Sequence, residues 1–574
     1  MIFKKWVLKV MGVLPFYLLS FLPLSALGVD YNVVPLPQSI QMQQGEPFVL
    51  DSSVQILAAD GLQQEAEFLQ MYLKDATGLT LPVAQKRSKK VSYIELTISP
   101  KVTEKEGYVL TIYKKGVTIA GGSAAGVFYG IQTLRKSVGF SVESVGFSVE
   151  SLELPAVVIT DAPRFTWRGM HLDCSRHFFS VAFVKKYIDL LALHNMNVFH
   201  WHLTDDQGWR IEIKKWPKLI AVGSQRSGTI IGTNSDLDDH IPYGGYYTQE
   251  EAREIVAYAA ARHITVVPEI DMPGHMLAAL ASYPELGCTG GPYQVGHYWG
   301  VYKDVLCVAN PKVYEFVEDV LTEIMDIFPS EVIHIGGDET PTEKWEQCPK
   351  CQGLAMQGTT DNGQQTTDDG PLGYAACYRR DARTTTESLQ ACFTKRVFDF
   401  LTAHHRRALG WDEILDGCPQ DAMIMSWRGT EPGAKAAETG HDVVMAPTTH
   451  CYFDYQQTED AQFEPSRCGG FIPVEKVYSL DPAPDNLSAA AKAHILGAQA
   501  NLWTEYIVNE EILEYQALPR LSALSEVQWT QPDRKDYEAF KQRLTRLTLL
   551  FEHDGYTYAK HLWPERQMPS RWQF

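Results

Sequence analysis

The strongest constraint on the fold is an alternation of apolar, strand-like runs with helical spacing that extends from residue 165 to residue 515. Helical spacing separates most of the runs, as at 183–192 and 250–262. Alternation of this kind predicts an α/β fold, and eight repeats of it predict a (β/α)8 TIM barrel. The predicted strands are 166–173, 196–204, 264–270, 331–335, 407–411, 422–427, 442–447 and 495–502.

The residues before the barrel differ in pattern. A chain of 574 residues is too long for one ordinary domain. Strand-like runs at 91–96 and 108–112 and helical stretches at 62–77 and 124–136 predict a small α+β accessory domain over 29–161. The catalytic domain then occupies 162–574 and ends in a helical segment. Within the first domain, the heptad 137–143 is repeated at once as 144–150, which predicts a lengthened surface loop or hairpin.

The N-terminus resembles an export signal. Residues 1–28 combine Lys4, Lys5 and Lys9 with an apolar run and a small-x-small site at Ala26-Leu27-Gly28. A retained membrane anchor is the alternative, but Pro15 and Pro23 interrupt the run, so we expect cleavage and no stable membrane insertion. The chain should be exported, either periplasmic or secreted. Its formal net charge of −19 argues against nucleic acid as a partner.

Polar and aromatic side chains follow the predicted strands. Active sites of TIM barrels lie where the strands end, and eight loaded ends in succession are hard to attribute to packing. A tryptophan at a single strand end is usually core, and Asp338-Glu339 alone could be an acidic helix N-cap. The strand ends are 175–177, 202–206, 268–275, 338–339, 410–413, 426–428, 452–454 and 502–505.

Aromatic rings together with arginine and carboxylates describe a sugar pocket, since rings stack on the apolar face of a pyranose and charged groups bind its hydroxyls. The carboxylates suggest glycoside hydrolysis. A conventional retaining enzyme needs two carboxyls about 5–5.5 Å apart on opposite faces of the bond. Asp338 and Glu339 are adjacent and cannot straddle a sugar ring, so they should act from one side, with the nucleophile coming from elsewhere.

Four long motifs resemble those of the family 20 glycoside hydrolases, the β-N-acetylhexosaminidases. The motifs are 175–178 (SRHF), 200–209 (HWHLTDDQGW), 268–275 (PEIDMPGH) and 334–339 (HIGGDE). The resemblance covers nearly the whole mature chain. It implies exo-acting, retaining hydrolysis of a terminal non-reducing β-linked N-acetylhexosamine, in which the substrate's acetamido oxygen attacks C1 to give an oxazolinium intermediate.

The resemblance also implies roles for individual residues. Glu339 matches the general acid, and Asp338 matches the residue that orients the acetamido group. Tyr452 would bind the acetamido carbonyl. The remaining substrate-binding residues are the wall tryptophans Trp411, Trp427 and Trp503, the hydroxyl-binding residues Arg176, Asp454 and Glu505, and the polar residues Asp205 and His275 behind the acid.

We expect no cofactor, and a glycan or glycoconjugate as the partner. Cys348 and Cys351 could be a redox pair, half of a zinc site or a small disulfide, but neither Cys377 nor Cys392 has a typical spacing to complete a zinc site, so no metal is expected. A local disulfide is expected instead in an exported protein. Segment 352–392, rich in Thr, Gln, Gly and Asp, departs from the family pattern and predicts a loop.

Two other functions stay open at this stage. One is a conventional double-displacement retaining glycosidase with another carboxylate, such as Glu505, as the nucleophile. The other is an inactive sugar-binding protein, which the intact Asp338-Glu339 pair disfavours.

Overall fold

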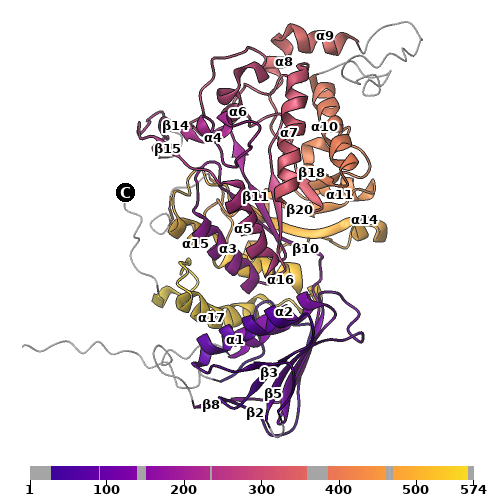
Figure 1. Cartoon of the computed structure of the whole chain (residues 1–574), viewed down its shortest axis with the longest axis vertical. Helices are drawn as coiled ribbons and strands as arrows, with labels where there is room; N and C mark the ends of the chain where they lie inside the picture. Colours follow the sequence, from indigo (N-terminus) through magenta and orange to yellow (C-terminus); the bar gives the residue numbers. More distant parts are fainter. Residues whose placement is uncertain are drawn as a thin grey trace, which may run out of the picture.

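The computed structural model describes residues 28–88, 91–138, 150–232, 235–357, 386–460, 464–465 and 469–566. In this part of the chain an N-terminal sheet is followed by a closed barrel (Figure 1). The predicted export signal lies outside the described residues except for Gly28, and so does most of the duplicated segment 137–150.

The N-terminal sheet is mixed and seven-stranded. Its order is β1 (Ser39–Met42), β9 (Val157–Asp161), β6 (Tyr108–Tyr113), β7 (Gly116–Gly121), β5 (Tyr93–Ile98), β3 (Gln55–Ala58) and β4 (Val83–Ala84). β2 (Phe48–Asp51) pairs separately with β8 (Ser151–Leu154). Alternate residues of β6 are buried, as expected for a sheet with one covered face. The covering helices are α1 (Gln63–Thr77) and α2 (Ala124–Val138).

The barrel consists of eight parallel strands that pair in chain order and close between the last and the first. This confirms the predicted (β/α)8 barrel. All seven residues of the first strand are buried, because a parallel barrel strand is covered by helices outside and by side-chain layers inside. The strands are β10 (Trp167–Asp173), β11 (Val198–His202), β16 (Thr265–Glu269), β17 (Val332–His334), β18 (Arg407–Trp411), β19 (Met423–Ser426), β20 (Val443–Met445) and β21 (Ile495–Ala500).

Helices with well-defined ends connect the strands. α5 begins with a capping box between Thr248 and Glu251, and α7 begins with the Asn310 cap followed by Pro311. The longer helices of this domain are α3 (Val181–Leu193), α5 (Gln249–Ala260), α7 (Pro311–Ile327), α10 (Thr386–Ala403), α11 (Glu431–Glu438), α15 (Glu510–Ala517), α16 (Arg520–Trp529) and α17 (Tyr537–His553).

Short elements fill the loops of the barrel. They include α4 (Lys218–Ala221), α6 (Leu277–Ser282), α8 (Glu343–Gln347), α9 (Pro349–Gln357), α12 (Thr448–Cys451), α13 (Val474–Tyr478), α14 (Ala489–His494) and the strand pairs β12 (Thr204–Asp205) with β13 (Gly208–Trp209) and β14 (Gln225–Arg226) with β15 (Tyr243–Gly244). The loop predicted over 352–392 is wrong at both ends, because α9 extends to Gln357 and α10 starts at Thr386. Residues 358–385 lie outside the described part.

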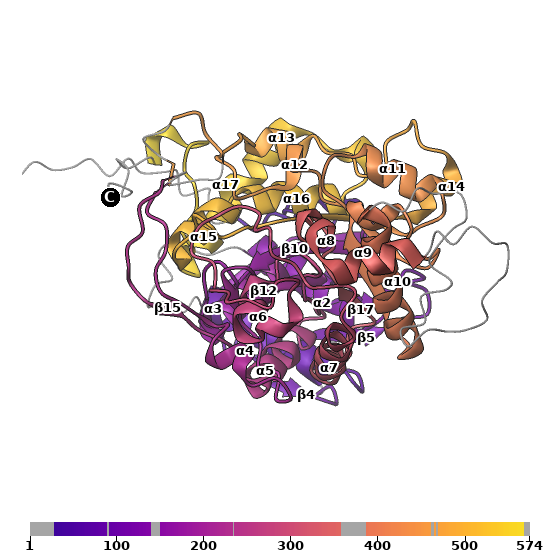
Figure 2. The same ribbon diagram turned by 90° about the horizontal axis from the view of Figure 1, so that it is seen from above.

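The two domains meet through buried polar contacts. Arg168 on β10 forms a bidentate pair with Glu106, and Trp529 Nε1 on α16 donates to Asp161 Oδ2. The N-terminal sheet and α8–α9 lie at opposite ends of the molecule (Figure 1), and the view onto α8 and α9 also shows α6 at that end (Figure 2).

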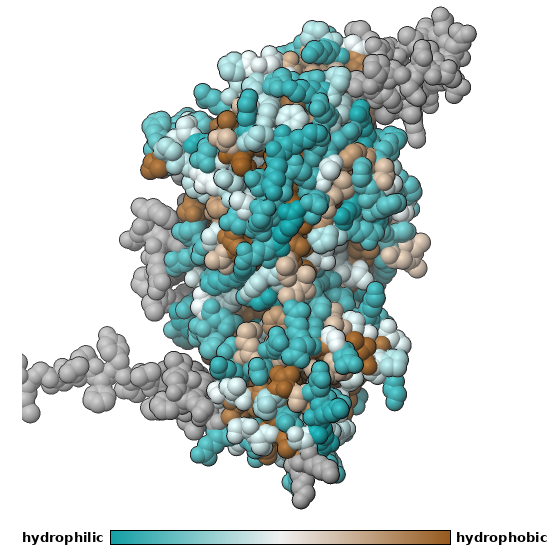
Figure 3. Space-filling model, in the orientation of Figure 1, coloured by the Kyte–Doolittle hydropathy of each residue, from teal (hydrophilic) through white to brown (hydrophobic). Residues whose placement is uncertain are grey.

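The surface seen in Figure 3 is mostly hydrophilic, with scattered hydrophobic residues. Among the described helices, none combines the length and hydropathy needed to cross a membrane.

Candidate active site

The chain turns sharply where β17 ends. Gly336 and Gly337 both have positive φ values, +69° and +94°. A Cβ on Gly336 would lie 1.7 Å from Asp271 Oδ1, and the Gly337 N–H donates to that same oxygen at 3.3 Å. Only glycine combines this backbone conformation with so close an approach. The turn presents Asp338 and Glu339 next to His275, with Asp338 largely buried and the Glu339 side chain 44% exposed.

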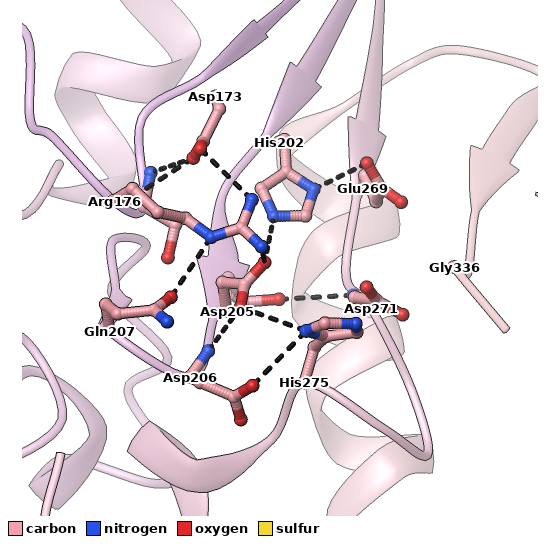
Figure 4. A network of polar contacts seen from close by, with 12 residues as sticks. Asp173, Arg176, His202, Asp205, Asp206, Gln207, Glu269, Asp271, His275 and Gly336 are labelled. Atoms are coloured by element: carbon pink, nitrogen blue, oxygen red, sulfur yellow. Dashed lines mark hydrogen bonds and ion pairs between the residues drawn. The ribbon is translucent and has the colours of Figure 1, made fainter. Parts of the chain in front are cut away.

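A network of charged groups lies behind these two carboxyls (Figure 4). Arg176 pairs with Asp205 at 2.8 Å and with Asp173 at 3.2 Å, and its Nε donates to Gln207 at 3.0 Å. Asp205 is in turn 3.0 Å from His202 Nε2. The residues come from the ends of β10 and β11 and from the β12–β13 turn, so three successive segments are fixed to one another.

His275 connects this network to the carboxyl pair. Its Nδ1 is 3.2 Å from both Asp205 Oδ1 and Asp206 Oδ2, and its Nε2 is 3.7 Å from Glu339 Oε2 and 3.8 Å from Asp338 Oδ2. Burial opposes the charged imidazolium, but Asp205, Asp206 and Glu339 together outweigh it, so the pKa of His275 is raised well above its ordinary value. A protonated His275 therefore faces both Asp338 and Glu339.

The two adjacent carboxyls differ in acidity. His275, whose Nε2 lies 3.7 Å from Glu339 Oε2, is the main cause that lowers the pKa of Glu339. Burial raises the pKa of Asp338, and the charges of Glu269 and Glu339 add to this effect against His275. One strand end thus holds two carboxyls whose pKa values move in opposite directions, which is the usual mark of a division of roles.

The floor of the site is a buried cluster around Glu269 at the end of β16. Its carboxylate is 2.6 Å from His202 Nδ1, 3.1 Å from His200 Nε2 and 3.0 Å from His334 Nδ1. Trp411 Nε1 donates to its other side at 2.9 Å. Burial alone would raise the pKa of Glu269, but His334, His202 and His200 hold it well below its ordinary value.

The aromatic residues lie at different depths. Trp411 is 1% exposed and lies in the floor, so it presents no open face. Trp503 is half-buried, with its ring 5.8 Å from that of Trp411 and 5.1 Å from the Arg176 guanidinium. Trp427 and Tyr452 stack at 6.1 Å with 27° between the rings.

Several buried polar atoms at this mouth have no hydrogen-bond partner among the described residues. They are Asp338 Oδ1, Asp454 Oδ1, Glu505 Oε2 and His275 Nε2. Burial, and then the charge of Glu505, raises the pKa of Asp454 well above its ordinary value. Unsatisfied buried groups are rare in folded proteins, and a cluster of them indicates a place for a polar ligand.

The residues predicted from the sequence fall into one region. Arg176, Asp205, His275, Asp338 and Glu339 are joined directly by the contacts above. Glu505 interacts with the charges of Arg176 and Asp205, and Tyr452 with the charges of Asp454 and Asp338. Within the described residues, three groups of acids and histidines could hold a metal here, but Arg176 and the histidines already balance their carboxylates.

Sequence reasoning missed Glu413, Glu269 and Asp271 as site residues, although all three stand at strand ends already noted. Glu413 Oε2 accepts from Trp427 Nε1 at 2.9 Å, and burial, with the charge of Asp338, raises its pKa to about 7. Its position two residues after Trp411 was the only signal in the sequence.

The chain is similar to known proteins over both of its domains. The family model for "Glycosyl hydrolase family 20, catalytic domain" matches residues 165–532, and the model for "Glycosyl hydrolase family 20, domain 2" matches residues 30–162. A β-hexosaminidase of Porphyromonas gingivalis is 40% identical over 531 residues, which are 92% of this chain and 64% of that protein. One of Akkermansia muciniphila is 34% identical over 449 residues, 77% of this chain and 83% of that protein.

Solved structures are similar over the whole fold. The exo-β-N-acetylglucosaminidase of Vibrio harveyi, in complex with N-acetylglucosamine, has a TM-score of 0.79 and 32% identity, and the match covers 93% of this chain and 79% of that one. The β-N-acetylhexosaminidase of Streptomyces coelicolor has a TM-score of 0.75 and 31% identity over 95% and 99% of the two chains. Since the catalytic-domain match alone spans more than half of the sequence, the chain belongs to glycosyl hydrolase family 20.

Proposed function

We propose that the chain removes terminal, non-reducing β-linked N-acetylhexosamine from glycans with net retention, and that the acetamido oxygen of the substrate is the nucleophile. The observation that carries the proposal is the buried, unpartnered Asp338 Oδ1 beside the accessible carboxyl of Glu339. An acetamido N–H is a donor that would satisfy this atom. The names of the relatives and the N-acetylglucosamine bound to the Vibrio harveyi protein support the same sugar class.

The roles follow from the environments of the two residues. Asp338 holds the acetamido group against C1 and offsets the positive charge that grows on its nitrogen. Glu339 protonates the leaving oxygen and later activates water. In the ligand-free protein its pKa is lowered by His275. A sugar over the 44% exposed side chain would exclude water and disfavour the carboxylate, which moves this pKa up towards that of a useful acid.

The aromatic groups complete the sugar pocket. Tyr452 is 7% exposed and lies against Trp427, so its hydroxyl is in a fixed place to donate to the acetamido carbonyl. Trp503 offers a face over the floor made by Trp411. Arg176, Asp454 and Glu505 bind hydroxyls, because two of them carry buried unsatisfied oxygens and the third lies against Trp503.

The test separates this mechanism from double displacement. Asp338→Asn should lower turnover sharply without any glycosyl-enzyme, and a thiazoline that mimics the cyclised intermediate should bind far more tightly than the parent sugar. β-Glucosides, which lack the acetamido group, should be nearly inert at saturation. Intact-mass analysis after incubation with a 2-fluoro glycoside decides the question, because a covalent adduct on Glu505 would establish the conventional mechanism instead.

The proposal also distinguishes an enzyme from a sugar-binding protein. Release of nitrophenol from a β-N-acetylglucosaminide by the purified chain is expected, and tight sugar binding without release would favour the binding protein. A matched pair of β-GlcNAc and β-GalNAc glycosides with the same aglycone then determines the preferred hexosamine.

Export belongs to the same proposal and rests on the basic, apolar and small-residue pattern of residues 1–28. N-terminal sequencing of the chain made in a Gram-negative host, after osmotic release of the periplasm, should begin at residue 29. A chain that keeps Met1 and stays with the membrane would support the anchor instead.

A further inference from the structure

Four cysteines far apart in the sequence converge beside the active-site end of the barrel. Cys288 follows the turn at Pro284–Leu286, and Cys307 precedes α7. Cys348 is the residue that ends α8, and Cys351 lies in the first turn of α9. Their four sulfurs all lie within 4.8 Å of one another, and all but Cys288 are buried.

The distances fit a tetrahedral ion better than disulfides. Cys307 Sγ is 3.7 Å from Cys351 Sγ and 3.9 Å from Cys348 Sγ, and Cys288 Sγ is 3.9 Å from Cys351 Sγ. Metal–sulfur bonds of about 2.3 Å in a regular tetrahedron place the sulfurs about 3.8 Å apart. A disulfide requires about 2.05 Å, and none of these four cysteines forms one, so the disulfide expected at Cys348–Cys351 is wrong.

We propose that Cys288, Cys307, Cys348 and Cys351 bind one structural Zn²⁺ ion. Four thiolates supply a closed, soft ligand set, which favours zinc over the oxygen-preferring Mg²⁺ and Ca²⁺. A cluster with several irons is excluded by room, since bridging sulfides would drive the cysteine sulfurs further apart.

The proposed site differs from the expectation of no metal in its choice of ligands. The two ligands that complement Cys348 and Cys351 are not the later Cys377 and Cys392 but the earlier Cys288 and Cys307, which belong to the preceding loop of the barrel. The pairing crosses 41 residues from Cys307 to Cys348 and includes the whole of α7. Such a spacing is not a local motif, so only the fold reveals the set.

The ion would join the two loops that carry the acid and its histidine. The loop after β16 carries His275 and then Cys288 and Cys307. The loop after β17 carries Asp338 and Glu339 and then Cys348 and Cys351. A hydrogen bond already joins the two loops, since Trp345 Nε1 donates to Leu306 O at 2.9 Å. Leu306 is in turn held near His275, because its N–H donates to Pro273 O at 3.1 Å. The zinc therefore acts as a clamp that holds Glu339 near His275.

The first experiment measures the metal and the thiols of the wild-type chain purified without added metal. Elemental analysis should find one zinc per chain, and X-ray absorption should find four sulfur neighbours at about 2.3 Å. After denaturation with a chelator and no reductant, peptide mapping should show all four cysteines alkylated. Cysteines that react only after reduction would mean two disulfides, and stoichiometric iron would mean another ion; either result overturns the zinc assignment.

The second experiment uses variants from both loops. Cys288→Ser and Cys348→Ser should each lose the zinc and melt at a lower temperature, whereas Cys418→Ser, a half-buried cysteine outside the cluster, should keep one zinc and the wild-type melting temperature. If the variants fail to fold, removal of zinc from the wild type by a strong chelator replaces them. Hydrogen exchange at residues 286–310 and 343–354 should then become faster, and unchanged exchange on loss of the ion would refute the clamp.

Discussion

Asp338 and Glu339 are neighbours in the sequence, yet their carboxyl groups have different surroundings. Asp338 is buried beside Glu269 and Glu413, and Glu339 lies towards solvent under the influence of His275. The backbone creates this difference, because Glu339 has a φ of +43°, a conformation that non-glycine residues rarely adopt. A strained residue at a strand end is a common feature of a functional position.

Loss of the acid at Glu339 should depend on the leaving group. Glu339→Gln removes the proton but keeps the size of the side chain, so kcat/KM should fall about 10²–10⁴-fold on natural disaccharides. Aryl glycosides with acidic phenols should lose much less, since their leaving group hardly needs the proton. Steady-state kinetics on both substrates measures the difference. The exposed Glu346→Gln, on α8, is the matched control and should leave both rates unchanged. Equal losses on both substrates would contradict the role of acid.

The pH dependence should report the charge of His275. Imidazolium at this position lowers the pKa of Glu339, so the protonated acid is lost at a lower pH than it would be otherwise. His275→Gln removes the positive charge; the pKa of Glu339 should rise and the alkaline limb of the kcat/KM profile should move to higher pH, although the maximum rate falls. A pH profile with an unshifted alkaline limb would show that His275 only supports the structure.

At the scale of elements, the strand ends explain how much of the site was predictable. Period and composition located all eight barrel strands, and β16, predicted at 264–270, is observed at Thr265–Glu269. Parallel strands in a closed barrel bring their C-terminal ends together, so Arg176, Asp205, His275 and Asp338 could be grouped from their positions alone. The depth at which a side chain is buried could not be predicted, because the burial of Trp411 depends on the Glu269–histidine cluster contributed by other strands.

The convergence of the four cysteines could not be predicted from the sequence for a similar reason. Cys288 and Cys307 meet Cys348 and Cys351 only because α7 and then β17 return the chain to the same end of the barrel. The helices at the two ends of segment 352–392 were not predicted either, since α9 and α10 flank a polar stretch whose composition is typical of loops. Local pattern describes elements well and describes contacts between distant loops poorly.

The turn after β17 should tolerate no side chain at Gly336. Gly336→Ala costs about 1–2 kcal/mol for the left-handed backbone alone, and its Cβ would displace Asp271, which receives the Gly337 N–H. Both the free energy of unfolding, from urea titration, and kcat/KM should fall. Gly353→Ala on α9 is the control, because its Cβ would meet nothing within 4 Å and alanine favours a helix. Similar effects from both substitutions would show that the turn is not constrained.

At the scale of the whole molecule, side-chain hydrogen bonds as well as surface contact bind the N-terminal domain to the N-terminal end of β10. The Arg168 side chain is 1% exposed and donates to both oxygens of Glu106, to Tyr129 OH and to backbone carbonyls. Asp161 accepts hydrogen bonds from Tyr108 OH of its own domain and from Trp529 Nε1 of α16. All of these partners except the partly exposed Glu106 are buried, so separation of the domains would leave unpaired polar groups.

The pair of Glu106 and Arg168 should therefore couple the stability of the two domains. Glu106→Ala leaves the buried guanidinium without its carboxylate and should destabilise the fold by about 3 kcal/mol, the lower end for a broken buried pair, because 22% of the Glu106 side chain is exposed. Burial opposes ionisation of Glu106, but the hydrogen bonds and the charge of Arg168, together with hydrogen bonds from Asn197 and Tyr129, outweigh it and lower the pKa of Glu106. The contribution of the pair is thus complete above pH 4.5 and is lost as the pH falls below it.

Urea unfolding at pH 7 and at acidic pH, with Glu104→Ala on the same loop as an exposed control, measures both effects. The difference between the two variants should be large at pH 7 and shrink on acidification, and two variants of equal stability at pH 7 would show that the domains are held together by other contacts.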